Sequence, residues 1–234
     1  MAGFAGFDCS GYPGDNTMSW LIANTNLVWC GYYLAPAPSH GNAGWMGKQA
    51  SLAAAGWGIA PVYVGQQVTG PGSLNPSTAT GQTDGAQAAG YMSSEGFPAG
   101  SYVYLDIENG PPLSQPQQDY LAAWSTAVVA GGYNPGVYCS HLLAAQIAVL
   151  QPGARIWAFR ISGIAPGNQN SPYPESDPAG CGYGAATAWQ LIQDCKIQIT
   201  PGGPYSLQVD LDSATTADPG APDAPPPAPT ATGE

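Results

Sequence analysis

Stretches with the two-residue apolar period of strands alternate along the chain with stretches that have helical spacing. The strand-like stretches cover residues 4–8, 28–33, 59–64, 102–108, 136–140, 155–160, 186–192 and 207–212. Helical spacing covers 44–55, 78–94 and 142–150, and Asp15 or Asn16 caps an earlier helix. The clearest helix follows Ser114, which has Gln117 at capping-box spacing.

Strands that alternate with helices are typical of a parallel sheet wrapped by helices, and eight strands favour closure. Residues 162–184 and 193–204 are rich in Gly, Pro and Asn, which predicts loops in place of helices. We therefore expect an α/β fold, a (β/α)8-type TIM barrel whose helices are degenerate or missing in the second half. A doubly wound open sheet is the alternative.

The composition divides the 234-residue chain into a barrel over 1–213 and a tail over 214–234. The tail is rich in Ala, Pro and Thr, so it buries little apolar surface and is expected to be disordered or a linker. It is a possible connection to a virion component or a fused domain. The N-terminus lacks the basic start and apolar core of a signal peptide, which suggests a trimmed product or a phage-type protein without a leader.

The charge of the chain argues against nucleic acid as a partner. Fifteen acids stand against four bases, for a net charge of -11, and the bases are scattered. Nucleic acid is therefore not expected as a partner, because nothing neutralises a phosphate backbone. No stretch of the sequence is long and apolar enough to predict a membrane span.

Four acids stand at strand ends. Asp106 and Glu108 lie on one face of the 102–108 strand, just before the turn Asn109-Gly110, while Asp8 and Asp210 belong to the first and last strands. In a closed barrel those two strands are neighbours, so all four acids are expected to face one cavity. Glycoside hydrolysis needs such a group, because one acid protonates the leaving oxygen and a carboxylate supports the cationic sugar.

Other chemistry has little support in the sequence. His40 and His141 are the only histidines and no His/Cys cluster accompanies them, so neither a metal nor another cofactor is expected. The five cysteines show no CxxC spacing. We interpret them as small apolar residues; the alternative is a Cys181–Cys195 disulfide in an oxidising compartment.

The chain resembles a known group of enzymes in four elements: Gly6-Phe7-Asp8, Tyr104-x-Asp106-x-Glu108, Trp189-Gln190 and Val209-Asp210-Leu211. They occur in the same order as in the family 25 glycoside hydrolases, the lysozyme-type muramidases. The chain is more similar still to the glycoside-hydrolase-like domains of unassigned function in bacterial secreted proteins and phage lysins.

This resemblance implies a protein that cuts or binds the glycan of bacterial peptidoglycan, outside the cell, at the cell wall or on a virion. By position, Glu108 is the general acid. Asp106 supports the substrate's N-acetyl group or the attacking water, and Asp8 and Asp210 bind substrate and set pKa values. The competing hypothesis is a carbohydrate-binding or virion structural module that keeps the barrel without turnover.

Aromatic side chains at strand ends are candidates for a saccharide groove, since sugar rings stack on aromatic faces, although core packing is the favoured explanation for any individual Trp. The candidate substrate-binding residues are Tyr33, Tyr63, Tyr104, Tyr138, Trp157, Arg160 and Trp189.

Overall fold

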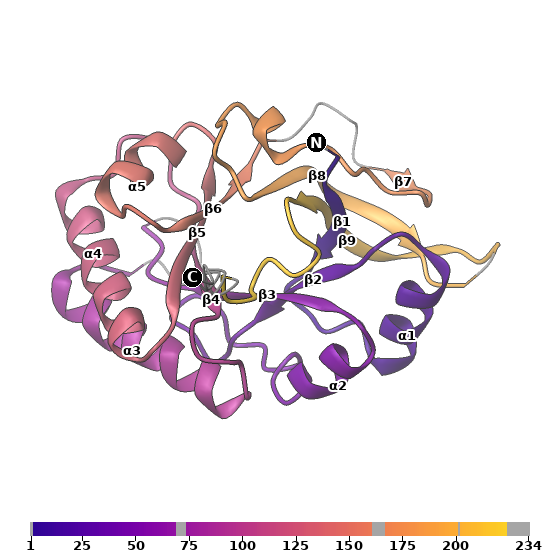
Figure 1. The fold of residues 1–234 in the computed structure, drawn as a ribbon, viewed down its shortest axis with the longest axis horizontal. Coiled ribbons are helices and arrows are strands. Elements are labelled where there is room, and N and C mark those ends of the chain that lie inside the picture. Colours follow the sequence, from indigo (N-terminus) through magenta and orange to yellow (C-terminus); the bar gives the residue numbers. More distant parts are fainter. Residues whose placement is uncertain (1, 69–73, 161–166, 201, 224–234) are drawn as a thin grey trace, which may run out of the picture.

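The structure, a computed structural model, describes residues 2–68, 74–160, 167–200 and 202–223. Eight of its nine strands form a closed barrel in the order β6-β5-β4-β3-β2-β1-β9-β8, which the pairing of β8 with β6 closes (Figure 1). The strands are β1 (Phe4–Asp8), β2 (Trp29–Tyr33), β3 (Gly58–Val64), β4 (Tyr102–Ile107), β5 (Asn134–Ser140), β6 (Arg155–Phe159), β7 (Asn168–Gln169), β8 (Ala188–Gln198) and β9 (Tyr205–Ala214). The short β7 pairs with β8 alone. The predicted barrel is confirmed, and the open sheet is excluded.

One strand departs from the parallel arrangement of a regular (β/α)8 barrel. β9 runs antiparallel to both of its neighbours, β8 and β1. Residues 199–204 connect β8 to β9, and a parallel crossover needs about a dozen residues or more. The short connection therefore makes β8 and β9 a hairpin.

Helices cover the first half of the barrel, as predicted. They are α1 (Asp15–Asn24), α2 (Gln49–Ala54), α3 (Thr78–Ser94), α4 (Gln115–Ala130) and α5 (Ala144–Leu150). After β6, the described residues contain a single 3-10 helix, η1 (Pro178–Cys181). The capping box at α4 is present, because the Ser114 N–H donates to Gln117 Oε1 over 2.8 Å.

Two cores follow from the alternation of side chains along the strands. One lies between the barrel and its helices, and the other fills the barrel interior. In the interior the Trp157 ring packs edge to face on Trp29 and Tyr104, at centroid distances of 5.3 and 5.7 Å. A Cβ at Gly6 would lie 2.2 Å from the Trp29 ring, so glycine makes room for this layer.

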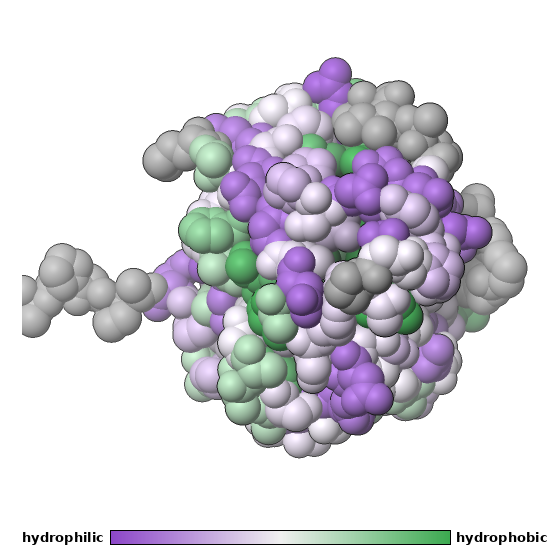
Figure 2. Space-filling model, turned by 90° about the vertical axis from the view of Figure 1, so that its right-hand side faces the viewer, coloured by the Kyte–Doolittle hydropathy of each residue, from purple (hydrophilic) through white to green (hydrophobic). Residues whose placement is uncertain are grey.

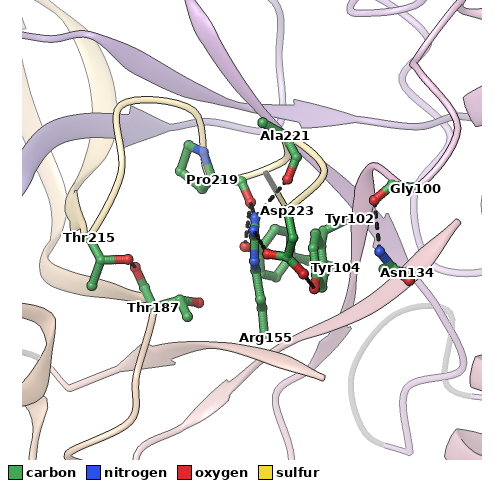
Figure 3. Close-up of polar contacts among 10 residues, drawn as sticks. All are labelled: Gly100, Tyr102, Tyr104, Asn134, Arg155, Thr187, Thr215, Pro219, Ala221 and Asp223. Carbon is green, nitrogen blue, oxygen red and sulfur yellow. Dashed lines mark hydrogen bonds and ion pairs between the residues drawn. The ribbon is translucent and has the colours of Figure 1, made fainter. Parts of the chain in front are cut away.

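Residues 215–223, which we call the C-terminal strap, cross the end of the barrel at which the parallel strands begin (Figures 1 and 3). The Arg155 guanidinium donates to the carbonyls of Pro219 and Ala221, over 2.7 and 2.9 Å, and pairs with Asp223 at 2.6 Å. The Tyr104 hydroxyl also donates to Pro219 O. The boundary predicted after residue 213 therefore lies too early, because composition does not reveal these specific contacts. The rest of the predicted tail, 224–234, lies outside the described residues.

The surface mixes hydrophobic and polar residues. On the face drawn in Figure 2, hydrophobic residues form patches separated by polar ones. None of the helices in the described part of the chain combines the length and apolar character needed to cross a membrane.

Candidate active site

The closed barrel gathers acids from three strands at its mouth, the end at which β1 and β4 finish. Asp8 ends β1 and lies directly opposite Asp210 of β9 in the strand register. Asp106 is the second-to-last residue of β4, and Glu108 follows that strand. The charge of Glu108 raises the pKa values of both Asp8 and Asp106, and the charge of Asp8 raises that of Asp106.

Asp8 is buried beside β2. Its Oδ1 accepts a hydrogen bond of 2.6 Å from the Tyr33 hydroxyl, and its carboxyl is within hydrogen-bonding reach of Asp212. A Cβ at Gly31 would lie 2.6 Å from the Cβ of Asp8, so glycine is what lets Asp8 fit here. Burial raises the pKa of Asp8 to about 6, and the hydrogen bond from Tyr33 partly opposes the rise.

Asp210 is held by a bulge in β8. The strand register shifts between Ile192 and Cys195, and Asp194 adopts a left-handed φ of 55° there. The bulge directs the Asp194 N–H to Asp210 Oδ1, over 2.7 Å, while the Gln190 amide donates to Oδ2 over 2.6 Å. Burial, followed by the charge of Asp8, raises the pKa of Asp210 to about 7.

Asp106 and Glu108 differ sharply in environment. Asp106 is 7% exposed, and its Oδ1 has no hydrogen-bond partner among the described residues. Burial, then the charges of Glu108 and Asp8, raise the pKa of Asp106 well above its ordinary value. Glu108 is exposed, and within the described ranges no hydrogen bond or ion pair fixes its side chain. The mouth thus pairs a solvent-facing acid with a buried one, which is an arrangement that can transfer a proton to a bound oxygen.

Three of the predicted aromatic residues point into the barrel near these acids. Tyr33 bonds to Asp8, and the Tyr138 hydroxyl donates to Gln190 Oε1. Trp157 lies at the floor, where its Nε1 donates to Asp212 Oδ1 over 3.0 Å. Tyr104 also points inward, but its hydroxyl reaches the strap at the other end of the barrel.

Three predicted substrate-binding residues do not line the mouth. Tyr63 faces the helices and donates to Gln87 Oε1 of α3 over 2.6 Å, since its neighbours on β3, Val62 and Val64, are the inward-facing ones. Trp189 packs outside the barrel and donates to Arg160 O over 2.9 Å. Arg160 is exposed and donates to Cys181 O, with no acid as its partner among the described residues.

Three residues of the site are not among the predicted site residues: Gln190, Asp194 and Asp212. Because side chains alternate along β8, Gln190 takes the inward position that excludes Trp189. The same alternation along β9 places Asp212 on the interior face that also carries Asp210, one layer deeper in the barrel. The two-residue spacing of these acids in the sequence is enough to predict this. The bulge that brings in Asp194 has no comparable sequence signal.

A cavity of about 400 Å³ opens between the loop after β1 and the β8–β9 hairpin. Asp8, Tyr33, Asp194 and Asp210 are among its lining residues. No group of His, Cys, Asp and Glu within the described ranges is arranged to hold a metal ion.

The family of the chain follows from its sequence together with this fold. The family model of the Rv2525c-like, glycoside hydrolase-like domain matches residues 21–211. The chain belongs to this family. The match includes Asp106, Glu108 and Asp210, whereas Asp8 precedes it. No curated protein sequence matches the chain.

Solved structures share the architecture of this glycoside hydrolase-like domain. An uncharacterized protein of B. stearothermophilus has a TM-score of 0.65 at 19% identity, with coverage of 91% of this chain and 96% of that one. The bacterial lysozyme from Streptomyces coelicolor has a TM-score of 0.56 at 14% identity, with coverage of 92% and 94%. The modular Cpl-1 endolysin, complexed with a peptidoglycan analogue, has a TM-score of 0.52 at 12% identity, with coverage of 92% and 54%. At these identities the likeness establishes the fold.

Proposed function

We propose that this protein is a glycosidase that cleaves the glycan strands of bacterial peptidoglycan, with Glu108 as the general acid. The observation that carries the proposal is the pairing, at one barrel mouth, of exposed Glu108 with the buried carboxyls of Asp8 and Asp106 and the partly buried carboxyl of Asp210. Cleavage of a glycosidic bond needs both a proton donor and a negative group beneath the sugar.

The chemistry assigns a task to each acid. Glu108 gives its proton to the glycosidic oxygen as the C1–O bond breaks, and the electron pair of that bond leaves with the oxygen. The positive charge that develops at C1 is stabilised by the carboxyl cluster. Asp106 orients the substrate's N-acetyl group or the water that adds to C1, and the proton of that water restores Glu108.

Two lines of support favour peptidoglycan as the substrate. The family is named for its likeness to glycoside hydrolases, and the structural neighbours include a bacterial lysozyme and an endolysin solved with a peptidoglycan analogue. Neutral hydrogen-bonding groups at the mouth, such as Tyr33 and Tyr138, suit sugar hydroxyls. We accordingly propose that this protein acts extracellularly, at the bacterial cell wall or as part of a virion.

A non-catalytic carbohydrate-binding or virion structural module is the second candidate. It is favoured by the absence, among the described residues, of any contact that holds Glu108 in one position. A catalytic acid is usually oriented by its neighbours, so this observation would fit a site that binds glycan without turnover.

The test is to incubate purified peptidoglycan with the parent protein, with Glu108→Gln and with Glu175→Gln, and to measure new reducing ends. Glu175 is the matched control, because it is an exposed acid far from the mouth. It lies near the start of β1, where its backbone carbonyl accepts a hydrogen bond from the Gly3 N–H. Release by the parent and the control, with at least a hundredfold loss in Glu108→Gln, supports hydrolysis. Binding by all three proteins without release supports the module.

A further inference from the structure

Asp212 is the most deeply buried acid of the cluster, and the reaction proposed above gives it no task. It is 1% exposed and lies on β9 opposite Gly6, one layer below Asp8 and Asp210. The Trp157 indole N–H donates to its Oδ1 over 3.0 Å, while its Oδ2 is buried with no hydrogen-bond donor among the described residues. A buried carboxyl oxygen without a donor is costly, so this atom needs an explanation.

Asp8 has the same pattern. Tyr33 donates to its Oδ1, and its Oδ2 is buried without a donor in the described part of the chain. The two carboxyl groups are within hydrogen-bonding reach of each other. Ionised carboxylates only accept hydrogen bonds, so the two unsatisfied oxygens become partners when one proton lies between them.

We propose that Asp212 is a positioning residue that shares one proton with Asp8 and thereby fixes the Asp8 carboxyl, with a single negative charge on the pair, in the wall of the cavity. Asp8 lines that cavity, and Asp212 lies beneath it. The catalytic consequence rests on the proposed function, whereas the shared proton does not.

The surroundings favour retention of that proton. The titratable groups that act on or respond to Asp212 are Asp8 from β1, Asp210 on its own strand, Tyr138 from β5 and Cys195 from β8. All of them are neutral or negative. The ion pairs found in the described residues, Lys48 with Asp15 and Arg155 with Asp223, lie elsewhere. Burial and the charges of Asp8 and Asp210 raise the pKa of Asp212 well above its ordinary value, and the Trp157 hydrogen bond only partly opposes this.

The direct test is a titration of the aspartate carboxyl carbons by carbon-13 NMR in the parent, Asp212→Asn and Asp119→Asn. In the parent, the Asp8 and Asp212 signals should respond together in two steps, since coupled sites share their titration. Asp212→Asn replaces the shared proton by an amide N–H, so Asp8 should show one step only. Asp119, an exposed residue on α4, is the control and should leave both steps in place. Independent, single-step titration of Asp8 and Asp212 in the parent would overturn the proposal.

Activity gives a second readout. Asp212→Asn can donate to Asp8 and accept from Trp157, so we expect a several-fold loss of kcat/KM. Asp212→Leu has similar size but leaves the Asp8 oxygen without a donor, so we expect a loss of at least fiftyfold with correct folding by circular dichroism. Equal losses in the two variants would indicate a packing role and contradict the proposal. If the parent shows no turnover, the proposed function fails, and the NMR titration still decides the shared proton.

Discussion

Replacing Arg155 by methionine tests whether the C-terminal strap is part of the folded barrel. The side chain of Arg155 is 16% exposed and makes two hydrogen bonds to strap carbonyls and one ion pair. Its guanidinium carbon also lies 3.7 Å above the centre of the Tyr102 ring. Methionine keeps much of the aliphatic packing and removes the charge and the donors.

The expected loss follows from the setting of each contact. A hydrogen bond from a charged donor contributes roughly 1.5–3 kcal/mol, and the partly buried bond from Arg155 to Pro219 O is of this kind. The side chain of Asp223 is 69% exposed, so its ion pair contributes at most about 1 kcal/mol. The contact with the Tyr102 ring adds about 1 kcal/mol. Arg155→Met should therefore lower the free energy of unfolding by about 3 kcal/mol.

The assay is urea denaturation followed by tryptophan fluorescence, with Arg160→Met as the matched control. Arg160 is exposed, and among the described residues its side chain makes one hydrogen bond, of 3.2 Å, so the loss of that side chain should cost less than about 1 kcal/mol. Arg155→Met should also make the strap more sensitive to limited proteolysis. Equal urea midpoints for the two variants would refute the idea that Arg155 holds the strap on the barrel.

Three further predictions concern the mouth. Gly31→Ala should displace Asp8, because the new Cβ would lie 2.6 Å from the Asp8 Cβ. The rate of hydrolysis should then fall by more than the loss of folded protein, followed by the melting temperature, can explain. Normal activity would contradict this prediction. Tyr33→Phe removes a hydrogen bond that lowers the Asp8 pKa, so that pKa should rise above about 6 in an NMR titration, and an unchanged value would contradict the assignment. In the folded protein the pKa values of Asp8 and Asp210 are raised from 3.8 to about 6 and about 7, so the folded state binds protons more tightly than the unfolded state. This stabilises the fold at low pH, and the stabilisation is lost between about pH 4 and pH 7 as the two groups ionise. The melting temperature should therefore fall over this interval, and less so in Asp210→Asn.

The sequence predicts the barrel because its strands and helices carry strong local patterns. The 78–94 helix and the box at Ser114 are local features, and the structure has both. The antiparallel β9 and the strap depend instead on long-range contacts, such as those of Arg155 with Pro219 and Asp223. No local period encodes such contacts.

The same distinction applies to the site. Strand-end position predicts that Asp8 and Asp106 lie near one mouth. Asp210 lies in the interior of β9, and it reaches the same mouth because barrel closure makes the last strand the neighbour of the first. Strand position does not say which of two adjacent side chains, Trp189 or Gln190, points inward. That choice is set by the register of β8 against β9, which places Gln190 opposite Asp212 on the interior face.

The identity of the new reducing sugar decides whether the carboxyl cluster at the mouth cleaves peptidoglycan glycan. Soluble products from peptidoglycan digested by the parent protein would be reduced with borohydride and analysed by mass spectrometry. We expect reduced N-acetylmuramic acid at the product ends, and its disappearance in Glu108→Gln. Reduced N-acetylglucosamine, intact glycan, or the same products from Glu108→Gln would contradict this expectation.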